Sequence, residues 1–285
     1  MSRIVIVAET GSDITAERAA ELGIELVPMH VSIGDKTIDD GTLAPAEMLE
    51  HCRQLGVLPR TAGCNPLDFQ TVFDRIHAED PEAQILYIAY SAVTTCSFES
   101  ARAAAEGRDY IYMYDTGHVT IGQALIVEET ARHLAENPQI GVEELLEWSR
   151  ELAGRVRMGF IPGDLGYLRA GGRLSNAAFL GATLLRIKPI IELIDGRLTA
   201  TKKLRGTMEK CAVGLMDHMA LQGDFDTSIV YFVRSSGLPL SVQQAAEHRA
   251  QQMGFKEWRW MDTQNVITSH CGPGSFAVAF AGLKL

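Results

Sequence analysis

Short apolar runs alternate with amphipathic segments along the first half of the chain. Residues 4–8 are all apolar, mostly β-branched, and show no polar alternation, which is typical of a strand covered on both faces of a parallel sheet. The pattern predicts further strands at 24–31, 85–90 and 110–114, and helices at 16–22, 45–54, 67–78, 119–136 and 142–154 with one more ending near 105. This alternation predicts an α/β fold whose first domain has a mainly parallel sheet flanked by helices.

Polar loops follow three of the expected strands. They span residues 9–13, 91–97 and 115–118, and a further loop, 60–66, follows Gly56 and Pro59. Ligands of open α/β sheets collect at the carboxyl ends of the strands. We therefore expect the first three loops to share one rim.

The second half of the chain has a different pattern. The whole chain, at 285 residues, exceeds the usual size of one hydrophobic core. We expect two domains, 1–155 and 156–285, the second a smaller α/β domain. Its predicted features are a glycine turn at 171–173, an apolar stretch at 177–193, a hairpin turn at Asp195-Gly196, a helix beyond 207, a strand at 229–233, a helix at 241–253 and a last segment at 266–280.

Composition narrows the function classes. Hydrophobic residues make up 46% and charged residues 22%, the balance of a globular protein. The net charge is −10 and no Lys/Arg run exceeds Lys202-Lys203, which argues against nucleic acid as a partner. The apolar run near the amino terminus is too short for a signal peptide or a transmembrane segment, so we expect a cytoplasmic protein.

Common catalytic and cofactor signatures are absent from the sequence. The five cysteines contain no C-x-x-C pair, which favours reduced thiols over disulfides or a metal site. No P-loop, dinucleotide fingerprint, H-E-x-x-H or G-x-S-x-G motif occurs, so no nucleotide cofactor is expected. Linear spacing alone neither supports nor excludes a Ser-His-Asp triad.

Two glycine turns are candidate anion sites. Gly272-Pro273-Gly274 fixes a tight turn whose backbone N–H groups can face an anion beside His270, although a structural turn explains the pattern about equally well. Gly171 and Gly172 precede Arg173, which leaves its guanidinium free to reach a carboxylate or phosphate; a surface turn is the alternative.

Three short hydroxyl side chains, Thr61, Ser91 and Thr95, lie on loops where they can donate to a carboxylate, although most such residues are caps and turn formers. The apolar run 177–185 mixes small and large side chains, as would line a slot for an alkyl chain. Ordinary core packing predicts the same composition.

The order of several motifs resembles the DegV family, the fatty-acid-binding subunits of bacterial fatty acid kinases, over essentially the whole chain. The motifs are Asp13-Ile14, Asp39-Asp40-Gly41, Tyr167-Leu168-Arg169-Ala170-Gly171-Gly172-Arg173-Leu174-Ser175, Lys203-Leu204-Arg205 and His270-Cys271-Gly272-Pro273-Gly274.

The resemblance implies a non-catalytic carrier of one long-chain fatty acid, with the lipid site at and below the domain junction. The acid's carboxylate would be bound by Thr61, by Ser91 or Thr95, and by His270. A separate ATP-dependent kinase subunit would phosphorylate it. Arg173 and Arg205 become candidates for ligand contact or kinase docking.

The chain departs from the family pattern in the expected head-group site. Thr61-Ala62-Gly63-Cys64-Asn65 stands where Thr-Ser-Gln-Pro-Ser is usual, Ala92 replaces the second serine of a Ser-Ser pair, and Glu9-Thr10-Gly11 replaces Asp-Ser-Thr. The sequence keeps a second hypothesis open, an acyl or phosphoryl hydrolase or transferase that uses Ser91 or Thr95 with His270.

Overall fold

The computed structural model describes residues 2–173 and 187–283, so the run 177–185 and the pair Leu174-Ser175 lie outside the described residues. Its first sheet has the strand order β2-β1-β6-β7 and is parallel throughout. The strands are β1 (Ile4–Glu9), β2 (Ile24–Val27), β6 (Gln84–Ala89) and β7 (Ile111–Asp115). The prediction of a parallel sheet is confirmed.

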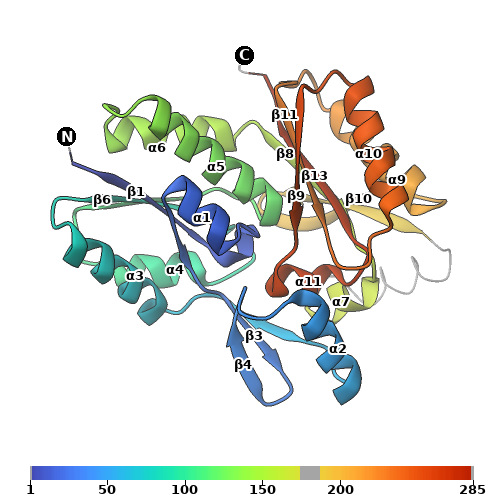
Figure 1. The fold of residues 1–285 in the computed structure, drawn as a ribbon, viewed down its shortest axis with the longest axis horizontal. Coiled ribbons are helices and arrows are strands. Elements are labelled where there is room, and N and C mark those ends of the chain that lie inside the picture. The colour runs from blue at the N-terminus through green and yellow to red at the C-terminus, as the bar shows by residue number, and fades with distance from the viewer. Residues whose placement is uncertain (1, 174–186, 284–285) are drawn as a thin grey trace.

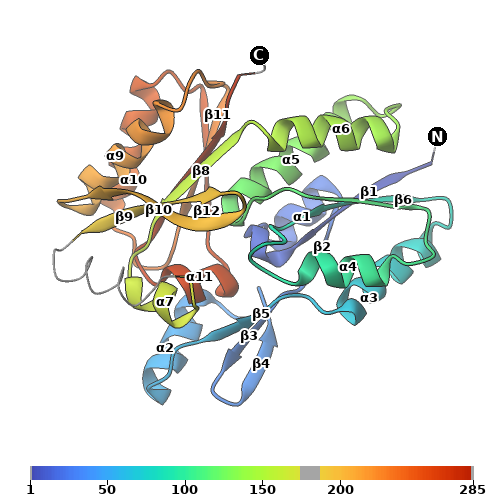
Figure 2. The same ribbon diagram turned by 180° about the vertical axis from the view of Figure 1, so that it is seen from behind.

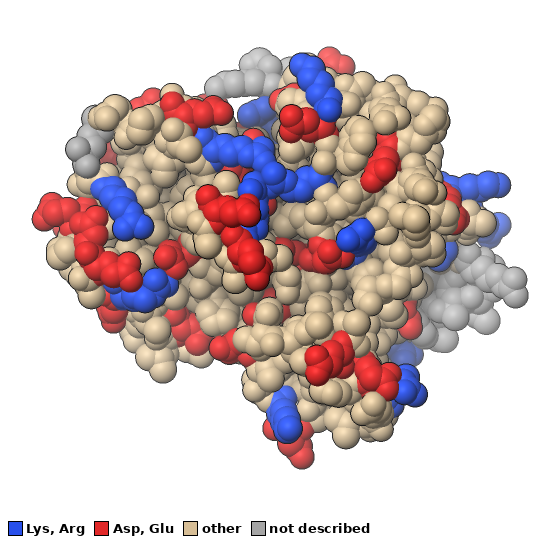
Figure 3. Space-filling model, in the orientation of Figure 1, with Lys and Arg blue, Asp and Glu red and all other residues tan. Residues whose placement is uncertain are grey.

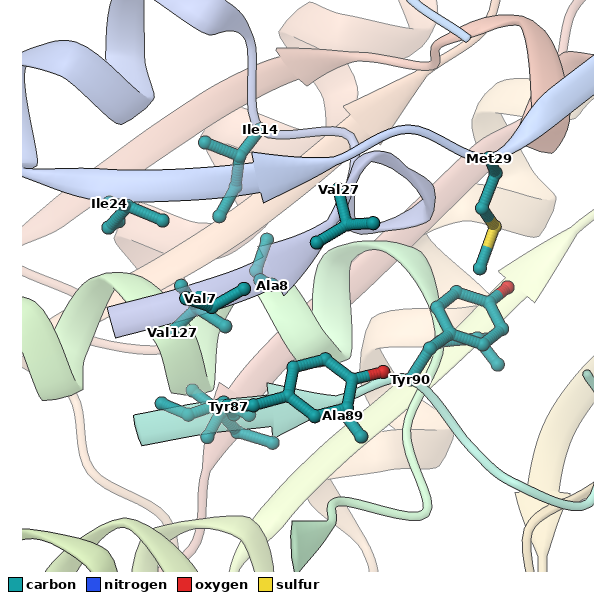
Figure 4. Packing of buried hydrophobic residues seen from close by; sticks show 14 of the residues in the cluster. Val7, Ala8, Ile14, Ile24, Val27, Met29, Tyr87, Ala89, Tyr90 and Val127 are labelled. Carbon is teal, nitrogen blue, oxygen red and sulfur yellow. The ribbon is translucent and has the colours of Figure 1, made fainter. Parts of the chain in front are cut away.

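Helices cover both faces of this sheet. In Figure 1, α5 (Thr120–Glu136) and α6 (Val142–Ala153) lie above it, and α3 (Pro66–Glu79) and α4 (Ser97–Ala104) lie below. The short helix α1 (Ala16–Leu22) contacts β2 and α5. Figure 4 shows the apolar side chains of β1 and β6 packed between these layers, which explains why both strands read as unbroken apolar runs.

The second sheet has six strands in the order β10-β9-β8-β13-β11-β12, and only the β11–β12 pair is parallel. Its strands are β8 (Val156–Ile161), β9 (Lys188–Ile194), β10 (Arg197–Leu204), β11 (Ile229–Arg234), β12 (Glu257–Asp262) and β13 (Phe276–Ala281). Helices α9 (Met208–Ala220) and α10 (Leu240–Gln252) pack on one face, as Figure 2 shows from behind. Asp195 and Gly196 both have positive φ and form the predicted hairpin turn.

A third, antiparallel sheet was not predicted. It has the order β4-β3-β5, with β3 (His30–Ile33), β4 (Lys36–Asp39) and β5 (Arg60–Ala62), and α2 (Pro45–Leu55) beside it. The predicted strand at 24–31 is wrong because Pro28, which has no N–H to donate, separates β2 from β3. The loop expected at 60–66 also contains β5.

Two short helices complete the junction between the sheets. They are α7 (Leu165–Ala170) and α11 (Asn265–Cys271), and they pack against each other. Helix α11 also contacts α2, β3 and β5, so a segment from the end of the chain is embedded among elements from its beginning. The division at residue 155 stays a prediction.

The surface carries charges of both signs, interspersed over the face that Figure 3 shows. Over the described part of the chain, no helix is both long and apolar enough to cross a membrane.

Candidate functional site

A cavity of about 400 Å³ lies where the three sheets meet. Its apolar wall comes mainly from the six-stranded sheet. Ala277 on β13 is paired with Phe160 on β8 and with Val233 on β11, so these three side chains lie on one face of the sheet. The cavity volume falls within the roughly 300–1,000 Å³ of small-molecule sites.

The polar end of the cavity joins the two halves of the chain. Thr61 on β5 and His270 near the end of α11 both line it, and Thr61 Oγ1 lies 2.9 Å from His270 Nε2. Strand pairing of Thr61 with Val31 fixes the position of the threonine. The structure thus brings together two of the four side chains predicted for the carboxylate.

Gly171 makes room for the His270 ring. A Cβ atom built on Gly171 would lie 2.2 Å from His270 Nδ1 and 2.6 Å from Cε1. Gly171 has φ −77°, which any residue adopts, so close approach and not backbone conformation requires glycine here. The absence of a side chain at Gly171 therefore leaves the space that the His270 imidazole occupies.

Thr95 also lines the cavity, but it is not bonded to His270. Its hydroxyl lies 3.0 Å from Ser97 Oγ, which accepts a hydrogen bond from the Cys64 N–H at 3.1 Å. A Cβ on Gly63 would lie 2.3 Å from Thr95 Oγ1, so glycine at position 63 lets the two loops touch. This is the structural consequence of one departure noted in the sequence.

Arg173 closes the same end of the cavity. Its Nη2 donates to the Thr94 carbonyl at 2.7 Å and its Nη1 donates to the Gly171 carbonyl at 2.6 Å. Arg173 therefore links the two halves through backbone carbonyls while it remains exposed. Among the described residues, no group of three or more His, Cys, Asp or Glu side chains is placed to hold a metal ion.

A family model described as "Uncharacterised protein, DegV family" matches residues 3–282. The chain belongs to the DegV family. A DegV domain-containing protein of Deinococcus radiodurans is 28% identical over 290 residues, which cover 99% of each chain. One from Caldanaerobacter subterraneus is 29% identical over 241 residues, 84% of this chain and 82% of the relative.

Solved DegV structures share the whole fold. A DegV family protein from Thermus thermophilus, reported for its fatty acid binding, has a TM-score of 0.86 and 25% identity, and covers 99% of this chain and 100% of its own. The fatty acid kinase B3 protein of Streptococcus pneumoniae, loaded with linoleic acid, has a TM-score of 0.82 at 17% identity, covering 98% of this chain and 99% of its own.

Two residues predicted for the DegV site lie elsewhere. Ser91 is fully buried and does not line the cavity, because its hydroxyl donates to the Gly196 carbonyl at 3.0 Å. Arg205 follows β10 as an exposed side chain and does not line the cavity either. Ser91 therefore joins a first-sheet loop to the β9–β10 turn.

The predicted anion-facing turns are also corrected. The backbone N–H groups of Gly171, Gly172, Gly272 and Gly274 donate to the carbonyls of Tyr167, Arg169, Thr268 and Ser236 at 2.9 to 3.0 Å. Each donor is thus already used within the protein. The glycines shape the site through close packing and, at positions 172, 272 and 274, through positive φ.

Two buried carboxyl groups that the sequence analysis left without a role hold α11 in place. Asp13 accepts from the Gln264 N–H at 2.6 Å and from the Thr120 hydroxyl, and Asp40 accepts from the Val266 N–H at 3.0 Å. Burial raises the pKa of both groups. These first-half residues cap the helix that presents His270, which gives the Asp13-Ile14 and Asp39-Asp40-Gly41 motifs a structural reason.

The three polar loops meet at one rim, as the sequence predicted. The Ser91 N–H donates to the His118 carbonyl at 2.8 Å, and the Tyr90 N–H donates to the Glu9 carboxylate at 3.1 Å. Glu9 is fully buried and also accepts from Tyr87 and Gln123, while burial raises its pKa. This network ties β1, β6 and α5 together beneath the cavity.

The imidazole of His270 is neutral near pH 7, since burial, together with the charge of Arg173, lowers its pKa to about 4 from an ordinary 6.5. In the unfolded chain the His270 imidazole takes up a proton below about pH 6.5, whereas in the folded chain it does so only near pH 4. The free energy of unfolding should therefore fall between those values by up to about 3 kcal/mol. Chemical denaturation at pH 7.5 and pH 4 should show a loss that is larger in the wild type than in His270→Gln by about this amount, since His118, whose pKa burial also lowers, contributes equally to both; equal losses would contradict the assignment.

Proposed function

We propose that this chain binds one long-chain fatty acid, with the acyl tail in the 400 Å³ cavity and the carboxylate at the Thr61–His270 end. The observation that carries the proposal is the asymmetry of the cavity. Apolar side chains of β8, β11 and β13 form one wall, whereas the Thr61 hydroxyl, the His270 imidazole and the Arg173 guanidinium lie together around Gly171.

The tail would supply most of the binding free energy. Burial of a methylene contributes about 0.8 kcal/mol, so a tail of roughly fifteen carbons yields on the order of 12 kcal/mol before ordering costs. The carboxylate loses water when it enters, and this loss must be offset by protein donors. The tail would therefore set affinity and the polar end would set position.

The Thr61–His270 pair can supply such a donor. When the neutral ring carries its proton on Nε2, it donates to Thr61 Oγ1 and leaves the threonine hydrogen free for a carboxylate. Nδ1 has no hydrogen-bond partner among the described residues, which suits an unprotonated nitrogen there. Thr95 lies on the same lining and is a second candidate donor.

The structural relatives support this reading, because fatty acid binding is reported for the Thermus thermophilus protein and linoleic acid is bound to the Streptococcus pneumoniae protein. We extend it to a carrier that presents the carboxylate to a separate ATP-dependent kinase subunit. Arg205 is exposed and outside the cavity, so kinase docking suits it better than ligand contact. Arg173 is exposed and lines the cavity, so it can contact either the bound acid or the kinase subunit.

The hydrolase or transferase alternative has weaker support. The Ser91 hydroxyl donates to the Gly196 carbonyl and Thr95 is paired with Ser97, so neither hydroxyl is bonded to His270. The lowered pKa of His270, caused by burial and the charge of Arg173, also makes the ring a weak general base.

Native mass spectrometry of gently purified protein tests the proposal, and a fatty acid should accompany the chain. Replacing Thr61 by valine keeps the shape of the side chain and removes its hydroxyl, so palmitate affinity measured by calorimetry should fall about tenfold or more. Thr71→Val is the control, because the Thr71 hydroxyl is exposed on α3 and bonds the Leu67 carbonyl. A protein that carries no lipid and rejects added palmitate would defeat the proposal.

A further inference from the structure

Tyr90 lines the cavity directly after β6 and belongs to neither the Thr61–His270 pair nor the Thr95 loop. Its side chain packs tightly, since a Cβ built on Gly11 would lie 3.1 Å from Tyr90 Cε2 and 2.8 Å from Met29 Sδ. Figure 4 shows the tip of Tyr90 pointing toward Met29. The glycine therefore leaves space for a ring whose position is fixed by its neighbours.

The Tyr90 hydroxyl forms no hydrogen bond with any residue in the ranges 2–173 and 187–283. Three other deeply buried tyrosines do have partners: Tyr87 donates to Glu9, Tyr231 donates to Glu129 at 2.8 Å, and Tyr114 is paired with Ser149. A buried phenol normally finds such a partner because leaving it unpaired costs free energy. The hydroxyl of Tyr90 is thus available to a bound molecule.

Outside the Thr61–His270 end, two other hydroxyls on the cavity wall are already used by the protein. Thr120 donates to the Asp13 carboxyl group, and Ser275 donates to the Cys271 carbonyl at 2.8 Å. Tyr90 differs from them because it brings a free donor to a largely apolar wall.

The phenol stays protonated, since burial raises its pKa above the ordinary value while the charge of Arg173 acts in the opposite direction. The same guanidinium lowers the pKa of His270, where burial is again the larger cause. Tyr90 and His270 therefore lie near the same cationic group, and the protonated Tyr90 hydroxyl can donate to an acceptor on a bound molecule.

We infer that the Tyr90 hydroxyl donates a hydrogen bond to an oxygen atom of the bound acid. The inference rests on the proposed function and deepens it. The acceptor is either an oxygen of the carboxylate or an oxygen atom on the acyl tail. Both would accept the same hydrogen bond from the phenol. An oxygen on the acyl tail would also give selection, because a site built to bond that oxygen rejects an acid that lacks it, whereas a contact with the carboxylate would add affinity for every fatty acid.

Tyr90→Phe removes the hydroxyl and keeps the ring, and Tyr112→Phe makes the same change on β7 outside the cavity lining. Calorimetry with palmitate and with a mid-chain hydroxypalmitate should show a loss of about tenfold or more for Tyr90→Phe and none for Tyr112→Phe. A loss for both acids assigns the contact to the carboxylate, and a loss for the hydroxylated acid alone assigns it to the chain oxygen.

Equal affinities of the wild type and Tyr90→Phe for both acids would overturn the inference while leaving the proposed function intact. A wild-type protein that binds neither acid would overturn both. Thermal unfolding midpoints of the two variants, measured alongside, verify that each is folded.

Discussion

Replacing Ala277 by leucine should weaken palmitate binding by roughly 50-fold, which corresponds to about 2.4 kcal/mol. Ala277 is the smallest of the three paired residues on the apolar wall, between Phe160 and Val233. The added carbons would occupy the space of about three methylenes of the tail, each of which contributes about 0.8 kcal/mol when buried. Calorimetric titration with palmitate measures the loss.

Decanoate is the internal control for this variant, because a shorter tail leaves part of the cavity unfilled and should lose much less affinity. Ala277→Val should give an intermediate effect with palmitate. Losses that are equal for the two acids, in a variant with an unchanged thermal midpoint, would show that the tail does not reach this wall.

Replacing Gly171 by alanine should reduce palmitate affinity by about 10- to 100-fold, the value of a hydrogen bond to a charged group. The new Cβ would lie 2.2 Å from His270 Nδ1, so the ring must shift and its 2.9 Å contact with Thr61 must break. Gly141→Ala is the matched control, since Gly141 has φ −79° and no atom within 4 Å of a built Cβ. Affinity is measured by the same titration.

A double-variant cycle separates this effect from general damage. If Gly171→Ala acts by displacing the imidazole, it should add nothing to the loss caused by His270→Ala, because no ring remains to be displaced. Additive losses in the cycle would show that Gly171→Ala weakens binding by a route other than displacement of the imidazole. They would contradict the claim that Gly171 is needed to make room for the His270 ring.

The regular part of the fold could be predicted from the sequence because the central parallel strands, β1 and β6, are apolar on both faces. Strand β5 could not, since Arg60–Ala62 is three residues long and carries no apolar pattern. Edge strand β12 was missed for a related reason, because Glu257–Asp262 mixes charges with half-buried tryptophans. In both cases pairing with a neighbouring strand decides the conformation, and local pattern does not.

Only those residues of the candidate site that lie in motifs shared with the family could be predicted from the sequence. Thr61 and His270 are 209 positions apart in the chain, and the family resemblance named both. Ser91 was misplaced because the Gly196 carbonyl, which belongs to the second sheet, binds its hydroxyl. Asp13 bonds a backbone group 251 positions away, so no local pattern reveals its role.

A crystal structure with a fatty acid brominated at its methyl end tests the central claim most directly, because anomalous scattering locates the end of the tail. The account predicts a carboxylate oxygen within hydrogen-bond distance of Thr61 Oγ1 and the bromine inside the cavity, against the apolar wall that contains Ala277. A ligand bound outside this cavity, or one with its carboxylate at the apolar wall, would contradict it.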